Sequence, residues 1–152
     1  MIGIENRLSL ISPELSSELL SLSDEGLRKV ALEVSSYAIE QTELKDPIVG
    51  ESLKALSRGN VGDLELLERL EEFVYKLDLI QWELQIMWEE DKVDEEEYIA
   101  AFRRARAANA LYFALYSDNQ VAAVESAYES IAAIDDLKKI KQIISNEFKK
   151  DK

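Results

Sequence analysis

The sequence contains no histidine and no cysteine. Without histidine, no serine or cysteine nucleophile can be activated by an imidazole, and imidazole proton shuttles and ordinary zinc sites are excluded. Without cysteine, the chain forms neither disulfides nor thiolate metal sites, which fits a reducing compartment. An enzyme built from this chain would have to use carboxylates, lysine, tyrosine or a hard cation, so we name no catalytic residue and expect no cofactor.

Long apolar runs are also absent. The longest segment without a charged side chain, Ala107 to Ser117, has eleven residues, whereas about 20 are needed to span a bilayer. The first residues, from Met1 to Leu8, lack the basic region and the following apolar run that are typical of a secretory signal. These absences predict a soluble, cytoplasmic protein that does not bind membranes.

Glycine and proline are scarce, with five and two residues in the chain. Ser12-Pro13 and Asp46-Pro47 each place a capping side chain before a proline at the first helical position. Apolar residues recur at helical spacing along the chain, and no segment shows the pattern of a β-hairpin. We therefore expect helices that begin near Pro13, Ser23, Pro47, Asp63, Asp94 (in a capping box with Glu97), Asn119 and Asp135.

These patterns predict an all-α fold, a single-domain bundle of six or seven helices around a long acidic central helix. The 152 residues, of which 47% are hydrophobic, are enough for one core. Residues 1–152 are therefore assigned to one domain, and the ends, 1–11 and 149–152, are expected to fray.

The segment Val61 to Glu97 holds most of the net charge. It contains fourteen acidic residues against three basic ones, which gives −11 of the chain's −13. Its helix, from Asp63 to Glu90, would be about 42 Å long at 1.5 Å per residue. Apolar residues alternate four and three apart along it, as in a coiled coil, and predict the main core seam: Leu66, Leu70, Phe73, Leu77, Ile80, Leu84 and Met87.

A second apolar stripe follows another face of the same helix: Tyr75, Leu79, Trp82 and Ile86. A helix with two apolar stripes has neighbours on both sides. The C-terminal half of this helix is therefore either central to the bundle or shared with a second copy, which leaves a homodimer through these four residues open. For Trp82 and Trp88 we favour core packing, with an exposed anchor for a partner as the alternative.

The acidic residues of this helix form the candidate site. An acidic surface repels nucleic acid and attracts basic proteins, although acids also form the solvated face of many amphipathic helices. We predict a protein that is not an enzyme and binds a basic protein partner, as an inhibitor or immunity-type neutraliser would. Small proteins of that kind resemble this chain in charge and size only. The predicted partner-binding residues are Glu68, Glu71, Glu72, Asp78, Trp82 and Glu83.

Some carboxylates lie at a spacing that could hold Mg²⁺ between helical turns: Glu40-x-x-Glu43-x-x-Asp46 and Glu68-x-x-Glu71. This arrangement is similar to the paired acidic motifs of the all-α nucleotide pyrophosphohydrolases, which bind Mg²⁺ between helices. The resemblance implies an alternative function, an Mg²⁺-dependent phosphohydrolase. Because Asp46 precedes a proline and suits a helix cap, we expect no specific metal site. A structural module that only forms homodimers is a third hypothesis.

Three arginines, Arg103, Arg104 and Arg106, follow the acidic segment in a stretch without acids. They could bind a phosphate or carboxylate, but we favour pairing with the excess acid of the preceding helix. Asn109 is the polar position on the aromatic stripe of their helix, and we expect it to satisfy a backbone group or fix register rather than bind a ligand.

Overall fold

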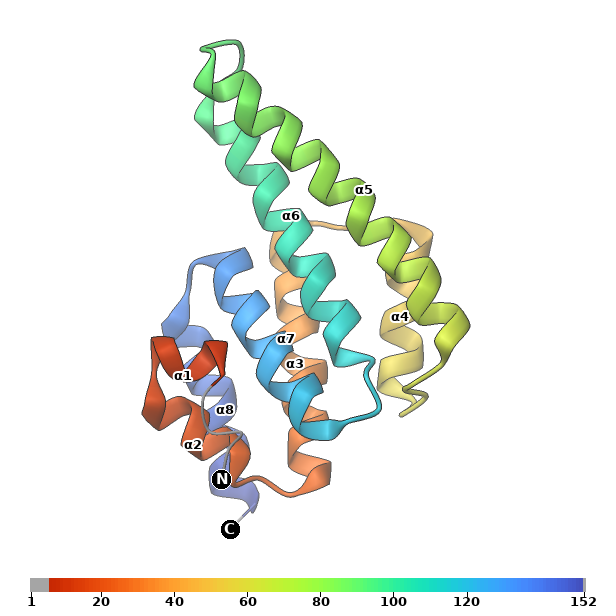
Figure 1. The fold of residues 1–152 in the computed structure, drawn as a ribbon. Helices are drawn as coiled ribbons and strands as arrows, with labels where there is room; N and C mark the ends of the chain where they lie inside the picture. Colours follow the sequence, from red (N-terminus) through yellow and green to blue (C-terminus); the bar gives the residue numbers. More distant parts are fainter. Residues whose placement is uncertain (1–5, 152) are drawn as a thin grey trace.

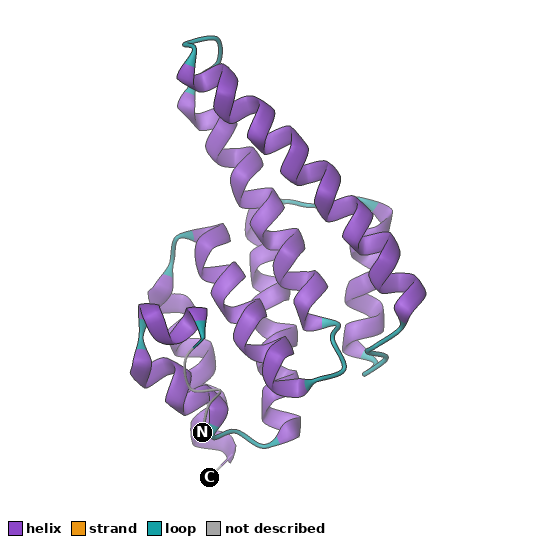
Figure 2. Ribbon diagram, viewed as in Figure 1, coloured by secondary structure: helices purple, strands orange, loops and turns teal. Residues whose placement is uncertain are grey.

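The computed structural model describes residues 6–151, and in that range it contains α-helices and no strand (Figure 2). The predicted all-α fold class is therefore confirmed. The eight helices of this range are α1 (Arg7–Ile11), α2 (Pro13–Leu20), α3 (Asp24–Thr42), α4 (Pro47–Ser57), α5 (Leu64–Glu89), α6 (Glu95–Ala114), α7 (Asn119–Ile134) and α8 (Leu137–Asp151). No helix in it is both long enough and apolar enough to cross a membrane.

The count of eight corrects the predicted six or seven, and the additional helix is α1. Asn6 and Ser9 start it with a reciprocal capping box, in which the Ser9 amide donates to Asn6 Oδ1 at 2.8 Å and the Asn6 amide donates to Ser9 Oγ at 3.0 Å. Leu8 is fully buried and holds the short helix on the body. Residues 1–5 and 152, also expected to fray, lie outside the described residues.

Side-chain caps start most of the longer helices where the sequence predicts them. Ser12 Oγ, Ser23 Oγ and Asp63 Oδ1 accept hydrogen bonds from amides in the first turns of α2, α3 and α5. Asp94 precedes α6 but makes no side-chain cap bond, so the predicted capping box with Glu97 is not formed. The Glu97 amide instead donates to the Asp94 carbonyl at 3.2 Å.

The core consists of two clusters on either side of α3. One lies between α3, α4, α5, α6 and α7 and includes Leu70 and Leu111. The other lies between α1, α2, α3, α7 and α8 and includes Leu19 and Ile140. Helices α3, α6 and α7 pack directly on one another, because buried alanines on α6 and α7 let the backbones approach closely: Ala105, Ala107, Ala108, Ala110, Ala114, Ala122, Ala123, Ala127 and Ala133.

The long helix α5 lies at an edge of the bundle. It packs on α6 and α4, and its C-terminal half projects with α6 beyond the other helices as an antiparallel hairpin (Figure 1). The predicted main seam holds near the body, where Leu66 and Leu70 are buried and Phe73 and Leu77 pack on the core. The predicted seam is wrong at Ile80. The Ile80 side chain is exposed because α5 extends past the core there.

Candidate interaction surface on α5

Four apolar side chains form an exposed row on the projecting part of α5, which we call the outer stripe. Their exposed fractions are 58% for Tyr75, 44% for Leu79, 50% for Trp82 and 56% for Ile86. Six of the nine large apolar side chains exposed in residues 6–151 belong to α5, so the exposure is concentrated on one helix. Within one chain the second stripe is therefore surface and not core.

The two tryptophans have different environments. Trp88 is half-buried and stacks on Tyr98 of α6, with ring centroids 5.2 Å apart, which closes the hairpin near its tip. Trp82 is half-exposed, so the favoured prediction that it packs in the core is wrong. When the buried Gln81 amide is oriented to satisfy its neighbours, its oxygen accepts from Trp82 Nε1 at 2.9 Å. This bond holds the indole in place while much of the ring stays exposed.

The acids around the outer stripe divide into two groups. Glu68, Glu71, Glu72 and Glu83 are exposed, and none of them forms an ion pair within residues 6–151. Asp78 is mostly buried and bonds Arg106 of α6 at 2.9 Å. Of the predicted partner-binding acids, Glu68, Glu71, Glu72 and Glu83 therefore face solvent, and Asp78 belongs to an internal network.

That network joins four helices through alternating charges. Arg106 bonds Asp78 of α5 at 2.9 Å and Glu129 of α7 at 3.0 Å. Glu129 also accepts from Arg7 of α1 at 2.9 Å, and Arg7 pairs with Glu125. Glu129 is only 1% exposed, so its charge depends on these two arginines for compensation. The predicted intramolecular pairing is thus found for Arg106, and it ties α5 to the body where the hairpin begins to project.

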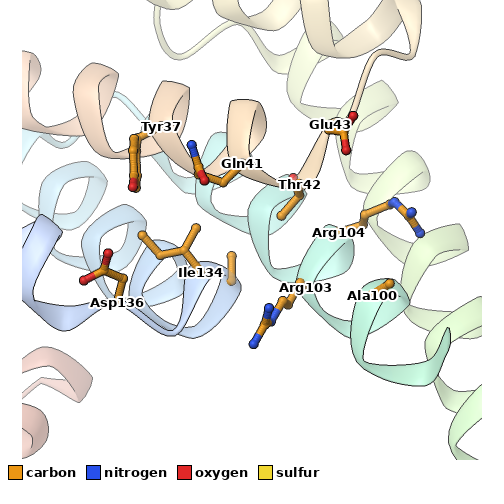
Figure 3. Close-up of a pocket in the computed structure, with 10 residues that line it drawn as sticks. Tyr37, Gln41, Thr42, Glu43, Ala100, Arg103, Arg104, Ile134 and Asp136 are labelled. Carbon is orange, nitrogen blue, oxygen red and sulfur yellow. The ribbon is translucent and has the colours of Figure 1, made fainter. Parts of the chain in front are cut away.

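Arg103 and Arg104 form no ion pair within the part of the chain that the structure describes, so the predicted pairing fails for them. They line a pocket of about 290 Å³ between α3, α6 and the α7–α8 connection, and Figure 3 shows them extending from α6 in different directions. Glu43 and Asp136 line the same pocket. Because both charge signs meet there, the pocket indicates no single class of ligand. Asn109 donates to the Ala105 carbonyl at 3.0 Å, a backbone bond of the predicted kind.

A second pocket, which we call the tyrosine groove, lies near the start of α5. It has a volume of about 370 Å³. Tyr116 donates to the Tyr112 hydroxyl at 3.4 Å, and Tyr112 donates to Glu71 Oε2 at 3.3 Å. Burial, the Tyr116 hydrogen bond and the nearby Glu71 together raise the pKa of Tyr112, so it stays protonated and continues to donate. The lining residues are Gly62, Leu64, Leu67, Glu68, Glu71, Tyr112, Tyr116 and Ser117.

The groove exists because the start of α5 lies against the end of α6. The Gly62 amide donates to the Leu115 carbonyl at 2.8 Å. Gly62 has φ +78°, and a Cβ on it would lie 3.1 Å from the Ser117 Cβ, so glycine is required at this close approach. Tyr112 and Tyr116 were not among the predicted site residues, because their spacing of four is equally typical of packing within a helix.

The tyrosine groove and the outer stripe lie along one face of α5. From residue 64 to residue 86, successive positions on this face are four, three, four, four, three and four residues apart. Residues 64, 75 and 86 therefore lie eleven residues apart, which is close to three whole helical turns. An eleven-residue spacing keeps a row almost parallel to the helix axis instead of winding around it. The face is therefore straight and about 33 Å long, and its members are Leu64, Glu68, Glu71, Tyr75, Leu79, Trp82 and Ile86.

The carboxylates with metal-like spacing do not gather in one place. Glu43 ends α3 with a φ of 57°. Asp46 precedes Pro47 at the N-cap position of α4, but its side chain makes no cap hydrogen bond, so the predicted side-chain cap is not formed there. In residues 6–151 no group of three or more acidic side chains is arranged to hold a metal ion. The convergence of acids expected for the phosphohydrolase is thus not found in this range.

Comparisons with protein-family models, with curated proteins and with solved structures found no match to this chain.

Proposed function

We propose that this protein is a non-enzymatic interaction protein that binds a basic helical segment of a partner along the straight face of α5. The observation that carries the proposal is the outer stripe, an exposed apolar row with acids beside it on a hairpin that projects from the body. An amphipathic helix binds such a row through apolar residues three and four apart. A protein of this kind acts as an inhibitor or neutraliser when the segment it covers is needed for the partner's activity.

The outer stripe offers enough apolar surface for specific binding. Burying a large apolar side chain completely is worth about 1.5–3 kcal/mol. The four side chains of the stripe are each about half exposed, so covering all of them is worth roughly 3–6 kcal/mol before the costs of association. Trp82 is the central aromatic, and tryptophan is among the residue types that contribute most at interfaces.

Charge favours a basic partner over a second copy of the chain. Glu68, Glu72 and Glu83 lie on or beside the straight face without an ion pair in residues 6–151. α5 carries two cations. Arg69 already pairs with Glu51 and Glu65, and Lys76 forms no ion pair within residues 6–151. A second copy would bring its own Glu68, Glu72 and Glu83 close to the same acids of the first copy, and the like charges would repel. A partner helix with lysine or arginine beside its apolar row would instead be attracted.

The test uses two fluorescein-labelled synthetic amphipathic helices with the same leucine row, one bordered by lysines and the other by glutamates. We expect anisotropy to show binding of the lysine peptide only, with an association rate that falls as salt rises, because salt screens exposed charges. Leu79→Ser with Ile86→Ser should weaken binding strongly. Leu10→Ser is the matched control, because Leu10 is 83% exposed on α1, away from the hairpin.

Three results would overturn the proposal. The first is equal binding of the two peptides, and the second is equal loss of binding in the Leu10 control. The third is a dimer in sedimentation that Leu79→Ser with Ile86→Ser converts to a monomer, because the stripe would then be covered by a second copy.

A further inference from the structure

We propose that the tyrosine groove is a binding site for an arginine side chain of the partner, held between the tyrosine rings and the carboxylates of Glu68 and Glu71. This inference deepens the proposed function and rests on it for the identity of the ligand. The groove volume of about 370 Å³ lies within the range of roughly 300–1,000 Å³ that is usual for small-ligand pockets.

The lining of the groove matches the two parts of an arginine side chain. Leu64 and Leu67 on α5 provide apolar surface for its methylene groups. Tyr112 and Tyr116 on α6 both line the groove, with ring centroids 5.4 Å apart and planes at 78°. A guanidinium group is attracted to the face of a tyrosine ring when it lies within about 6 Å of the ring centre.

Acceptors for the guanidinium remain available at the rim of the groove. Glu71 uses Oε2 to accept from Tyr112, and no bond to its Oε1 is present within residues 6–151. Glu68 is exposed and accepts no hydrogen bond in the same range. Arginine presents several N–H groups in a planar fork, which suits two carboxylates beside an aromatic ring better than the single ammonium of lysine does.

The same chain already holds an arginine with the same combination of groups. The guanidinium carbon of Arg7 lies 4.2 Å from the centroid of the Tyr128 ring. Its nitrogens bond Glu125 and Glu129, two carboxylates on neighbouring turns of α7. In the tyrosine groove, Glu68 and Glu71 also lie on neighbouring turns of one helix, three residues apart instead of four, but no cation of residues 6–151 pairs with them. The groove therefore has the groups of an arginine site without an arginine from this chain.

The position of the groove gives the register of the partner. Glu71 lies four residues before Tyr75, about 6 Å along the helix axis. A partner helix that covers the outer stripe would thus carry its arginine about one turn beyond its first apolar contact.

The test titrates the full chain with N-acetyl-arginine methylamide and, separately, with N-acetyl-citrulline methylamide, a neutral analogue of the same shape. We expect saturable NMR shifts of the Glu68, Glu71, Tyr112 and Tyr116 amides with the arginine probe and binding at least tenfold weaker with the citrulline probe. Glu68→Gln with Glu71→Gln should weaken arginine binding at least tenfold. Glu72→Gln with Glu83→Gln is the matched control, because it removes the same charge from the same helix outside the groove.

Equal binding of the two probes would overturn the inference, as would equal weakening by the control pair. Leu79→Ser with Ile86→Ser separates this inference from the proposed function, because it should leave binding of the arginine probe unchanged. If the lysine-bordered peptide binds the outer stripe but the arginine probe does not shift the groove, the groove inference fails and the proposed function stands. If the probe binds and the peptide does not, the proposed function fails instead.

Discussion

The buried carboxylate of Glu129 should be one of the most sensitive polar positions in the protein. It is 1% exposed and accepts from Arg106 at 3.0 Å and from Arg7 at 2.9 Å. Glu129→Gln keeps the shape of the side chain but removes the charge that both arginines face. Breaking a buried ion pair costs about 3–5 kcal/mol. Because Arg106 keeps Asp78 and Arg7 keeps Glu125, we expect the lower end, about 3 kcal/mol.

Urea unfolding followed by circular dichroism would measure this loss, and a thermal melt should shift down by about 6–12 °C for a chain of this size. Glu125→Gln is the matched control, since Glu125 is more exposed and, within residues 6–151, forms an ion pair only with Arg7, itself 42% exposed. It should cost less than about 1 kcal/mol. If Glu129→Gln cost no more than this control, the network would not be holding the helices together. A double-mutant cycle with Asp78→Asn should give a coupling of about 0.5–3 kcal/mol through the shared Arg106.

The two faces of α5 should differ in their contribution to stability, and the raised pKa of Glu33 should make stability depend on pH. Leu70→Ala should lower the free energy of unfolding in urea by about 2–5 kcal/mol, because Leu70 is fully buried. Leu79→Ala, the same change on the outer stripe, should lower it by less than about 0.5–1 kcal/mol. Similar losses for the two variants would show that the outer stripe is buried in solution. Burial and the neighbouring Glu147 raise the pKa of Glu33, so the folded state binds more protons than the unfolded state, and stability falls as pH rises through the raised pKa. Glu33→Gln should therefore raise the melting temperature near pH 7 but not below the pKa of a free glutamate, and an equal effect at both pH values would refute this cause.

The fold class and most helix starts could be predicted because they depend on local chemistry. Ser12, Ser23 and Asp63 cap helices through amides two or three residues away, and such bonds form wherever the segment folds. Helix α1 was missed because its capping box pairs Asn6 with Ser9 instead of a glutamate. Its position also depends on Leu8, which is buried against residues distant in the sequence.

The place of α5 could not be predicted from its sequence. Both apolar stripes have the spacing of a core seam, and only tertiary packing decides which one is buried. Beyond the body, the polar Gln81 is buried and the apolar Ile80 faces solvent. This is the opposite of what the polarity of the two side chains predicts. The tyrosine groove was missed for a related reason, because Glu71 and Tyr112 are 41 residues apart and no local pattern links them.

The two sides of α5 differ in how strongly folding constrains their side chains. Its inner side carries Leu66, Leu70 and the bond from Asp78 to Arg106, so most changes there lower stability. Outer-stripe side chains instead face solvent along a projecting hairpin, where substitutions are usually nearly neutral for folding. Selection can therefore change these positions without weakening the bundle. Related chains that face different partners should diverge most on this face while the sequence of the inner side stays nearly constant.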